Sequence, residues 1–216
     1  MPQPTGSWGL TQGHVSQGGD GLSRPLRPQI EGGIYHIGSR GVRKLPIYTD
    51  DSSRHHFLSL LDLVTAKYHW ELHTYCLMTN HYHLLITTVE PTLSVGMQYL
   101  LSNYAQWFDW RNGFEGHVFE RRFFSRVIET DRDLLTTLRY ILLNPVRAGI
   151  CDTPAEWRWS SYRATASAEP TWTSPRLSSW SLDYFGRRDS AQSRSRFADF
   201  IRAGEPDARS KRQERG

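Results

Sequence analysis

The chain has 216 residues and a formal net charge of +4, a length that suits one domain of ordinary size with some tail. Apolar residues make up 38% of it, with 8 Trp, 10 Tyr and 9 Phe, so a hydrophobic core can form, which excludes disordered, collagen-like and low-complexity chains. No apolar run approaches the ~20 residues of a membrane span, and Cys76 and Cys151 are too few for a disulfide framework. We therefore expect a cytoplasmic protein with no membrane partner.

Composition divides the chain into three parts. Residues 1–32 are rich in glycine and proline without hydrophobic periodicity, which is typical of a flexible tail. Residues 33–166 carry the periodic hydrophobic patterns of a folded domain. Residues 167–216 form a Ser- and Arg-rich extension, in which residues 196–202 can form a short helix with Phe197, Phe200 and Ile201 on one face.

The periodic segments predict strands and helices in alternation. Residues 34–37 form a first strand, and the start signal at residues 50–53 precedes a helix. Residues 70–78 and 82–89 form a hairpin, 93–110 a second helix, and 118–119 and 123–128 further short strands. A third helix opens at Asp131 and runs to Asn144, where Pro145 is expected to stop it. This order predicts an α+β fold, a ferredoxin-like antiparallel sheet with helices packed on it.

A histidine pair lies where the second strand of the predicted hairpin begins. His81 and His83 are two residues apart, so they point to the same face of a strand and can reach one cation. Such a pair also arises by chance. Taken alone, it fits surface or hydrogen-bonded side chains better than a metal site. The remaining histidines, His36 among them, fit structural or surface roles.

The third helix carries Tyr140 and Asn144 at i and i+4, which makes their side chains neighbours. A tyrosine hydroxyl is a weak nucleophile, but it can attack a phosphodiester when a metal polarises the phosphate. His81, His83 and the side-chain carbonyl of Asn144 could hold that metal. Imidazole favours softer metals and oxygen favours Mg²⁺ or Mn²⁺, so ligand chemistry alone does not choose the ion.

Arginine is the dominant cation, with 23 Arg against 3 Lys, and its planar fork suits phosphates and base edges. One cluster interleaves Arg121, Arg122 and Arg126 with Phe119, Phe123 and Phe124. In one interpretation the arginines bind phosphates and the aromatic rings stack on bases, which would suit single-stranded nucleic acid. In the other, the phenylalanines belong to the hydrophobic core and the arginines are exposed to solvent. Four further arginines could join this surface: Arg40, Arg43, Arg139 and Arg147.

Two stretches carry a family resemblance. Residues 78–85 (MTNHYHLL) and 140–149 (YILLNPVRAG) resemble the HUH single-tyrosine transposases, and most of all the bacterial REP-associated tyrosine transposases. Three more segments support it in the same order, 35–41 (YHIGSRG), 116–123 (GHVFERRF) and 159–162 (WSSY). The resemblance covers residues 33–165. It departs from the usual pattern at Thr79, where Pro is frequent, and at Glu120, where Gln is common.

The resemblance implies a reaction on single-stranded or hairpin DNA. Tyr140 would be the nucleophile that forms a 5′-phosphotyrosine link, and His81, His83 and Asn144 would bind Mg²⁺ or Mn²⁺. From the arginine clustering, and not from the resemblance, we expect the DNA to be bound by Arg40, Arg121, Arg122, Arg126 and Arg147. Two alternatives stay open: a DNA-binding protein that has lost catalysis, and a metal-dependent phosphodiesterase that uses water. The active form would be a monomer or a homodimer, and a dimer could exchange the tyrosine helix.

Overall fold

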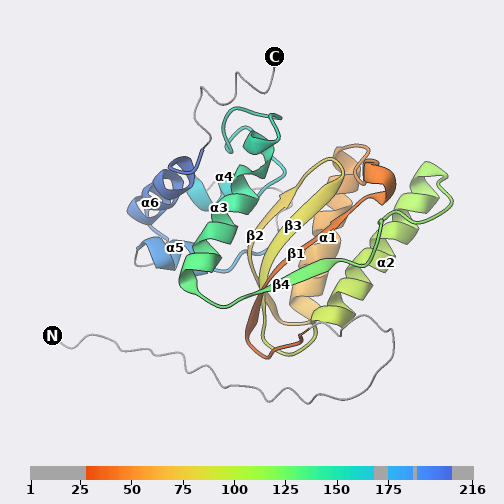
Figure 1. Ribbon diagram of the computed structural model, residues 1–216, viewed down its shortest axis with the longest axis horizontal. Coiled ribbons are helices and arrows are strands. Elements are labelled where there is room, and N and C mark those ends of the chain that lie inside the picture. Colours follow the sequence, from red (N-terminus) through yellow and green to blue (C-terminus); the bar gives the residue numbers. More distant parts are fainter. Residues whose placement is uncertain (1–27, 168–174, 187–188, 206–216) are drawn as a thin grey trace.

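The sheet of this protein has four strands, all of them antiparallel to their neighbours (Figure 1). The strands are β1 (Gly33–Arg40), β2 (Trp70–Leu77), β3 (His81–Thr88) and β4 (Phe124–Ile128), in the spatial order β2-β3-β1-β4. The computed structural model describes residues 28–167, 175–186 and 189–205. This strand order, with helices packed on the sheet, confirms the predicted ferredoxin-like α+β fold.

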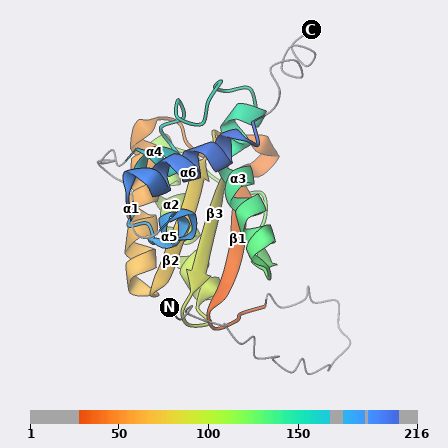
Figure 2. The same cartoon turned by 90° about the vertical axis from the view of Figure 1, so that its left-hand side faces the viewer.

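Helices surround the sheet and bury its two faces (Figures 1 and 2). On one face lie α1 (Asp51–Lys67) and α2 (Leu93–Asn112), together with the first hydrophobic core. A second core forms around α3 (Asp131–Arg147) with α4 (Tyr162–Ala166), α5 (Trp180–Phe185) and α6 (Ala191–Arg202). A short 3₁₀ turn, Val42–Lys44, follows β1. No helix among the described residues combines the length and the apolar character needed to cross a membrane.

The alternation of side chains along β3 decides which face carries polar chemistry. Leu84 and Ile86 belong to the first core, whereas Leu85 belongs to the second, under α3. Because successive strand residues point to opposite faces, His81 and His83 share the face of Leu85. The histidine pair therefore faces the tyrosine helix.

Two of the long helices, α1 and α3, begin at side-chain caps. At the start of α1, the Ser53 amide donates to the Asp50 carboxylate (2.7 Å) and the Asp50 amide donates to the Ser53 hydroxyl (3.1 Å), which forms a capping box. At the start of α3, the Asp133 amide donates to the Thr130 hydroxyl (3.1 Å). The predicted helix starts at these two points are confirmed.

The predicted end of α3 at Asn144 is wrong, because the helix continues through Pro145 to Arg147. Proline lacks a backbone N–H, so Pro145 removes one hydrogen bond of the helix. In the last turn this loss is small, because the residues after it can still close the turn. The turn is closed by the Ala148 amide, which donates to the Asn144 carbonyl (2.9 Å), and the left-handed φ of Gly149 (66°) ends it. The longer helix keeps Arg147 on the same side as Tyr140.

The predicted strand at residues 118–119 is also wrong. Only an isolated bridge between Gly41 and Phe119 forms there, and the paired strand begins at Phe124. Single hydrogen bonds tie the segment to the end of β1 and to the turn after it: the Glu120 amide donates to the Arg40 carbonyl (2.9 Å), and the Val42 amide donates to the Val118 carbonyl (3.0 Å). Val118 is buried in the first core. Its hydrophobic side chain is therefore explained by core packing and does not indicate a paired strand.

Helix α6 of the C-terminal extension packs against α3. The helix predicted at residues 196–202 is confirmed and begins earlier, at Ala191, where the Ser193 amide donates to the Ser190 hydroxyl (3.1 Å). Phe197 and Ile201 are fully buried in the second core. The predicted tail over 1–32 lies, up to residue 27, outside the described residues.

Candidate active site

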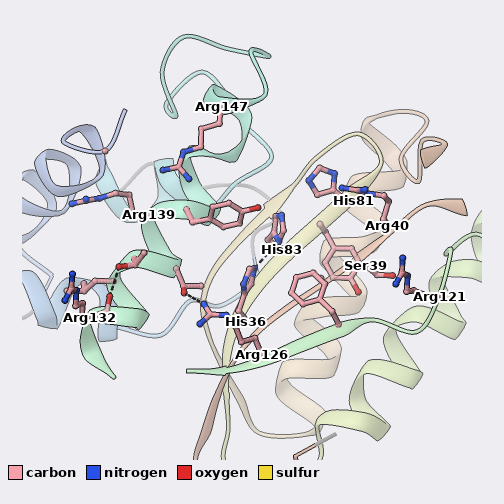
Figure 3. A pocket seen from close by; sticks show the side chains of 18 of the residues that line it. His36, Ser39, Arg40, His81, His83, Arg121, Arg126, Arg132, Arg139 and Arg147 are labelled. Atoms are coloured by element: carbon pink, nitrogen blue, oxygen red, sulfur yellow. Dashed lines mark hydrogen bonds between the residues drawn. The ribbon is translucent and has the colours of Figure 1, made fainter. Parts of the chain in front are cut away.

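A cavity of about 1030 Å³ lies between α3 and the open face of β1, β3 and β4 (Figure 3). Its walls carry seven arginines and a single carboxylate, Glu120. The arginines are Arg40, Arg121, Arg122, Arg126, Arg132, Arg139 and Arg147. Figure 3 shows Arg139 and Arg147 extending from α3 on one side of the histidines and Arg40 on the other. Such an excess of fixed positive charge favours an anionic ligand.

The register of the sheet brings the histidines and their neighbours together. Gly38 of β1 pairs with His83 of β3 on one side and with Phe124 of β4 on the other. A methyl group at Gly38 would overlap the Phe124 ring, so this position has room for glycine alone. Two residues further along β1, and on the same face, Arg40 pairs with His81. The floor of the cavity is thus built from three different strands.

His83 is buried and is bonded to a second histidine. The Nδ1 atom of His83 lies 3.0 Å from Nε2 of His36, on the neighbouring strand. Burial lowers the pKa of His83 to about 3 and that of His36 to about 4, and nearby positive charge adds to both effects. Both rings are therefore neutral at pH 7. Since Nδ1 of His83 is engaged, its Nε2 is the atom left for a ligand.

His81 is half-buried and is held by two asparagines. Its Nδ1 atom lies 2.8 Å from Oδ1 of Asn80. Burial lowers the pKa of His81, while a hydrogen bond with the side chain of Asn144 acts in the opposite direction. The rings of His81 and His83 lie 5.2 Å apart between centroids. The fold thus brings together the three residues expected as metal ligands.

The donor set fits a divalent cation with open positions. It consists of two neutral imidazoles on one strand face and an amide side chain beside one of them. Across residues 28–167, 175–186 and 189–205, no group of three or more His, Cys, Asp or Glu side chains could hold a metal. A site here would depend on the Asn144 oxygen and leave coordination positions for substrate.

Tyr140 lies on the exposed side of α3, directly above this floor. Its side chain is 39% exposed, and its ring centroid lies 5.5 Å from that of His83 and 5.9 Å from that of His36. The guanidinium carbon of Arg147 lies 5.6 Å from the Tyr140 ring centroid. A phenol, two imidazoles and a guanidinium group therefore share one open end of the cavity within a single chain.

All five arginines expected to bind DNA line the cavity, whereas Arg43 does not. Arg126 is the most constrained of them. It donates to the Asp133 carboxylate (2.6 Å) and to the Thr137 hydroxyl (2.7 Å), both on α3. This pair of bonds ties β4 to the tyrosine helix beside the site.

The three phenylalanines of the basic cluster divide between two roles. Phe119 and Phe123 pack in the first core, while Phe124 is 46% exposed and lines the cavity. Of the two interpretations left open by the sequence, the core applies to Phe119 and Phe123. Phe124 alone of the three is available to a base.

Several cavity residues were not identified as such from the sequence. The sequence predicts a structural or surface role for His36 and carries no local signal that sets Arg132 apart. Alternation in the first strand does place His36 opposite the buried Tyr35 and Ile37, but the pattern does not say which strand lies beside it. Tyr184 and Phe200 come from α5 and α6, whose docking no local signal predicts.

A family model described as transposase IS200 like matches residues 30–144, which include His81, His83, Tyr140 and Asn144. This chain belongs to the IS200-like transposase family. It is an enzyme of the single-tyrosine class, as its motifs indicate. A Haemophilus influenzae protein with the provisional name REP-associated tyrosine transposase is 27% identical over 159 residues, which span 68% of this chain and 90% of that protein.

Two solved structures resemble this transposase. A REP-associated tyrosine transposase bound to a REP hairpin superposes with a TM-score of 0.56 at 17% identity, covering 73% of this chain and all of that one (100%). A Deinococcus radiodurans protein described as a transposase gives a TM-score of 0.40 at 13% identity, over 55% of this chain and 95% of its own. The first likeness supports the assigned fold.

Proposed function

We propose that this transposase cleaves and rejoins single-stranded or hairpin DNA through a covalent link to Tyr140. The observation that carries this proposal is the position of the Tyr140 ring, 5.5 Å from that of His83, in a cavity walled by seven arginines. A nucleophile, candidate metal ligands and a phosphate-binding wall converge there. The protein of known structure bound to a REP hairpin supports hairpin DNA as the substrate class.

In the proposed reaction the Tyr140 hydroxyl oxygen attacks the scissile phosphorus. Its proton leaves to solvent, the bond from phosphorus to the 3′ oxygen breaks, and that oxygen takes up a proton. The products are a 5′-phosphotyrosine and a free 3′-hydroxyl. A second 3′-hydroxyl can then attack the phosphotyrosine and release Tyr140, so that strands are rejoined without ATP.

His81, His83 and Asn144 are the residues that would hold Mg²⁺ or Mn²⁺ in this site. When bound, the ion would polarise the phosphate and stabilise the charge that develops on it. The protein's own contribution is to keep both imidazoles neutral and oriented. Burial does the first, and the hydrogen bonds to His36 and Asn80 do the second.

The arginines supply binding to the DNA backbone. Arg40, Arg121, Arg122 and Arg147 are exposed at the cavity wall, where their guanidinium groups can pair with phosphates. Arg126 is already bonded to Asp133 and Thr137, so it orients the wall more than it adds free charge. Because Tyr140 and His83 meet within one chain, a complete site does not require exchange of the tyrosine helix between two copies.

A Tyr140→Phe variant tests the proposal, since it removes only the hydroxyl. Labelled hairpin DNA with Mn²⁺ should give a covalent protein–DNA adduct on a denaturing gel with the wild type and none with the variant. DNA binding, measured by fluorescence anisotropy, should be unchanged. Full cleavage by Tyr140→Phe would favour the water-dependent phosphodiesterase. Binding without cleavage by the wild type would favour a protein that has lost catalysis.

A further inference from the structure

The cavity has a second end, away from the histidines, that is built partly by the C-terminal helices. It is lined by Leu135, Thr136, Arg139, Tyr184, Phe200 and Gly204. Tyr184, Phe200 and Gly204 follow the 30–144 segment that matches the family model. The extension therefore contributes side chains to the same hollow as Tyr140, and the chemistry of those side chains indicates what they bind.

Arg139 is held in place at this end by the extension. Its guanidinium carbon lies 3.8 Å from the centroid of the Phe200 ring. A methyl group at Gly204 would overlap the Arg139 side chain, so the backbone of the extension closes directly over it. The buried Nε atom of Arg139 has no hydrogen-bond partner in the part of the chain that the structure describes. A guanidinium group that is held in place and lines the cavity suits an anionic or hydrogen-bond-accepting ligand there.

Tyr184 adds an open aromatic surface to the same cavity that Arg139 lines. Its side chain is 47% exposed, and its ring packs at 5.6 Å from Trp180 and 5.3 Å from Phe185 between centroids. One side of the ring is thus fixed by neighbours of the same helix, and the rest lies toward the cavity. An exposed aromatic ring that shares a cavity with an arginine is the arrangement on which single-stranded nucleic acids stack their bases.

We infer that α5 and α6 form a nucleotide subsite, in which an unpaired base stacks on Tyr184 and Arg139 binds its phosphate or base edge. This inference rests on the proposed function. The base must be unpaired because bases within a duplex already stack on each other. Arg139 directly precedes Tyr140, with Cα atoms ~3.8 Å apart and side chains diverging by ~100° around the helix. The bound nucleotide therefore lies within a few positions of the scissile phosphate.

The test compares two DNAs in the absence of metal, a hairpin with single-stranded flanks and the same hairpin with none. Fluorescence anisotropy should show that Tyr184→Ala weakens binding of the flanked hairpin roughly 5- to 150-fold, the usual effect of losing one stacked base. The blunt hairpin should bind as before. Tyr184→Phe, which keeps the ring, should behave as the wild type. Trp110→Ala removes an aromatic side chain that is 80% exposed on α2 and serves as the matched control.

Fluorescent 2-aminopurine placed at successive flank positions locates the base. One position should show quenching with the wild type that is lost in Tyr184→Ala and kept in Tyr184→Phe. Equal affinities of wild type and Tyr184→Ala for the flanked hairpin, or quenching that Tyr184→Ala leaves intact at every position, would overturn the subsite alone. Failure of the wild type to bind either DNA would overturn the proposed function together with it.

Discussion

His36 and His83 share a buried hydrogen bond of 3.0 Å between Nε2 of the first and Nδ1 of the second. The bond joins β1 to β3 and engages Nδ1 of His83, which leaves Nε2 of that ring for a ligand. In metal sites, the partner of the second imidazole nitrogen fixes the tautomer and orientation of the ligand. His36 is placed to do this for His83.

Replacing His36 separates orientation from simple packing. In His36→Leu, Nδ1 of His83 loses its acceptor, and we expect Mn²⁺ affinity to fall roughly 10- to 100-fold. In His36→Gln, an amide oxygen can accept the same bond, so most of the affinity should remain. Isothermal titration calorimetry with Mn²⁺ measures both variants. If His36→Leu binds Mn²⁺ as the wild type does, the hydrogen bond has no such role.

Arg147 should contribute to DNA affinity through phosphate contact. It is exposed at the cavity wall beside the Tyr140 ring. In Arg147→Ala, the dependence of the logarithm of affinity on the logarithm of salt concentration should become shallower by ~0.7, the value for one phosphate of a single strand. Arg202→Ala removes an arginine that is paired to Asp199 outside the cavity. Anisotropy titrations at several salt concentrations should show a wild-type slope for this control.

Folding stability should decrease as the pH is lowered toward 4, because a buried histidine stays neutral in the folded protein while the same histidine in the unfolded chain binds a proton. Burial lowers the pKa of His73 to about 4, and its ring atoms bond to Ser178 (2.6 Å) and Thr87 (2.7 Å). Between pH 6.5 and 4 the unfolded chain binds the extra proton, so the free energy of unfolding falls by up to ~1.4 kcal/mol per pH unit for this one group.

Urea unfolding at several pH values measures this effect. His73→Gln should give a shallower decrease than the wild type between pH 6.5 and 4. His69→Gln, at a surface position 71% exposed beside Glu90, should leave the wild-type slope in place. An identical slope for His73→Gln and wild type would mean that His73 does not carry the predicted proton linkage.

Gly38 should be sensitive to the smallest enlargement. A methyl group there would meet the Phe124 ring and the carbonyl oxygen of Tyr82. We expect Gly38→Ala to lower the free energy of unfolding by about 1–3 kcal/mol, the usual effect of overpacking. Adding Phe124→Ala to this variant should recover part of the loss beyond the effect of Phe124→Ala alone. Thermal or urea unfolding of the wild type, the two single variants and the double variant measures the four free energies of unfolding. If the effects of the two substitutions simply add, the clash with the Phe124 ring is excluded.

Local patterns in the sequence predicted the order of the main strands and helices between residues 33 and 144, apart from the strand expected at 118–119 and the end of α3. They also predicted which residues of the site share a face. The two-residue spacing of His81 and His83 placed both on one strand face, and helical spacing made Tyr140 and Asn144 neighbours. Both predictions follow from the spacing of residues within one strand or one helix, so they need no information about the rest of the fold. The family resemblance rested on the same short stretches, and the match to residues 30–144 confirmed it.

Tertiary structure decided which of these faces meet. The pairing of β1 between β3 and β4 sets His36 against His83, and the continuation of α3 past Pro145 keeps Arg147 beside Tyr140. The docking of α6 on α3 puts Phe200 under Arg139. Periodicity tells which side of a strand or helix a residue occupies. Its partner across the sheet, or on another helix, depends on long-range packing that no local pattern encodes.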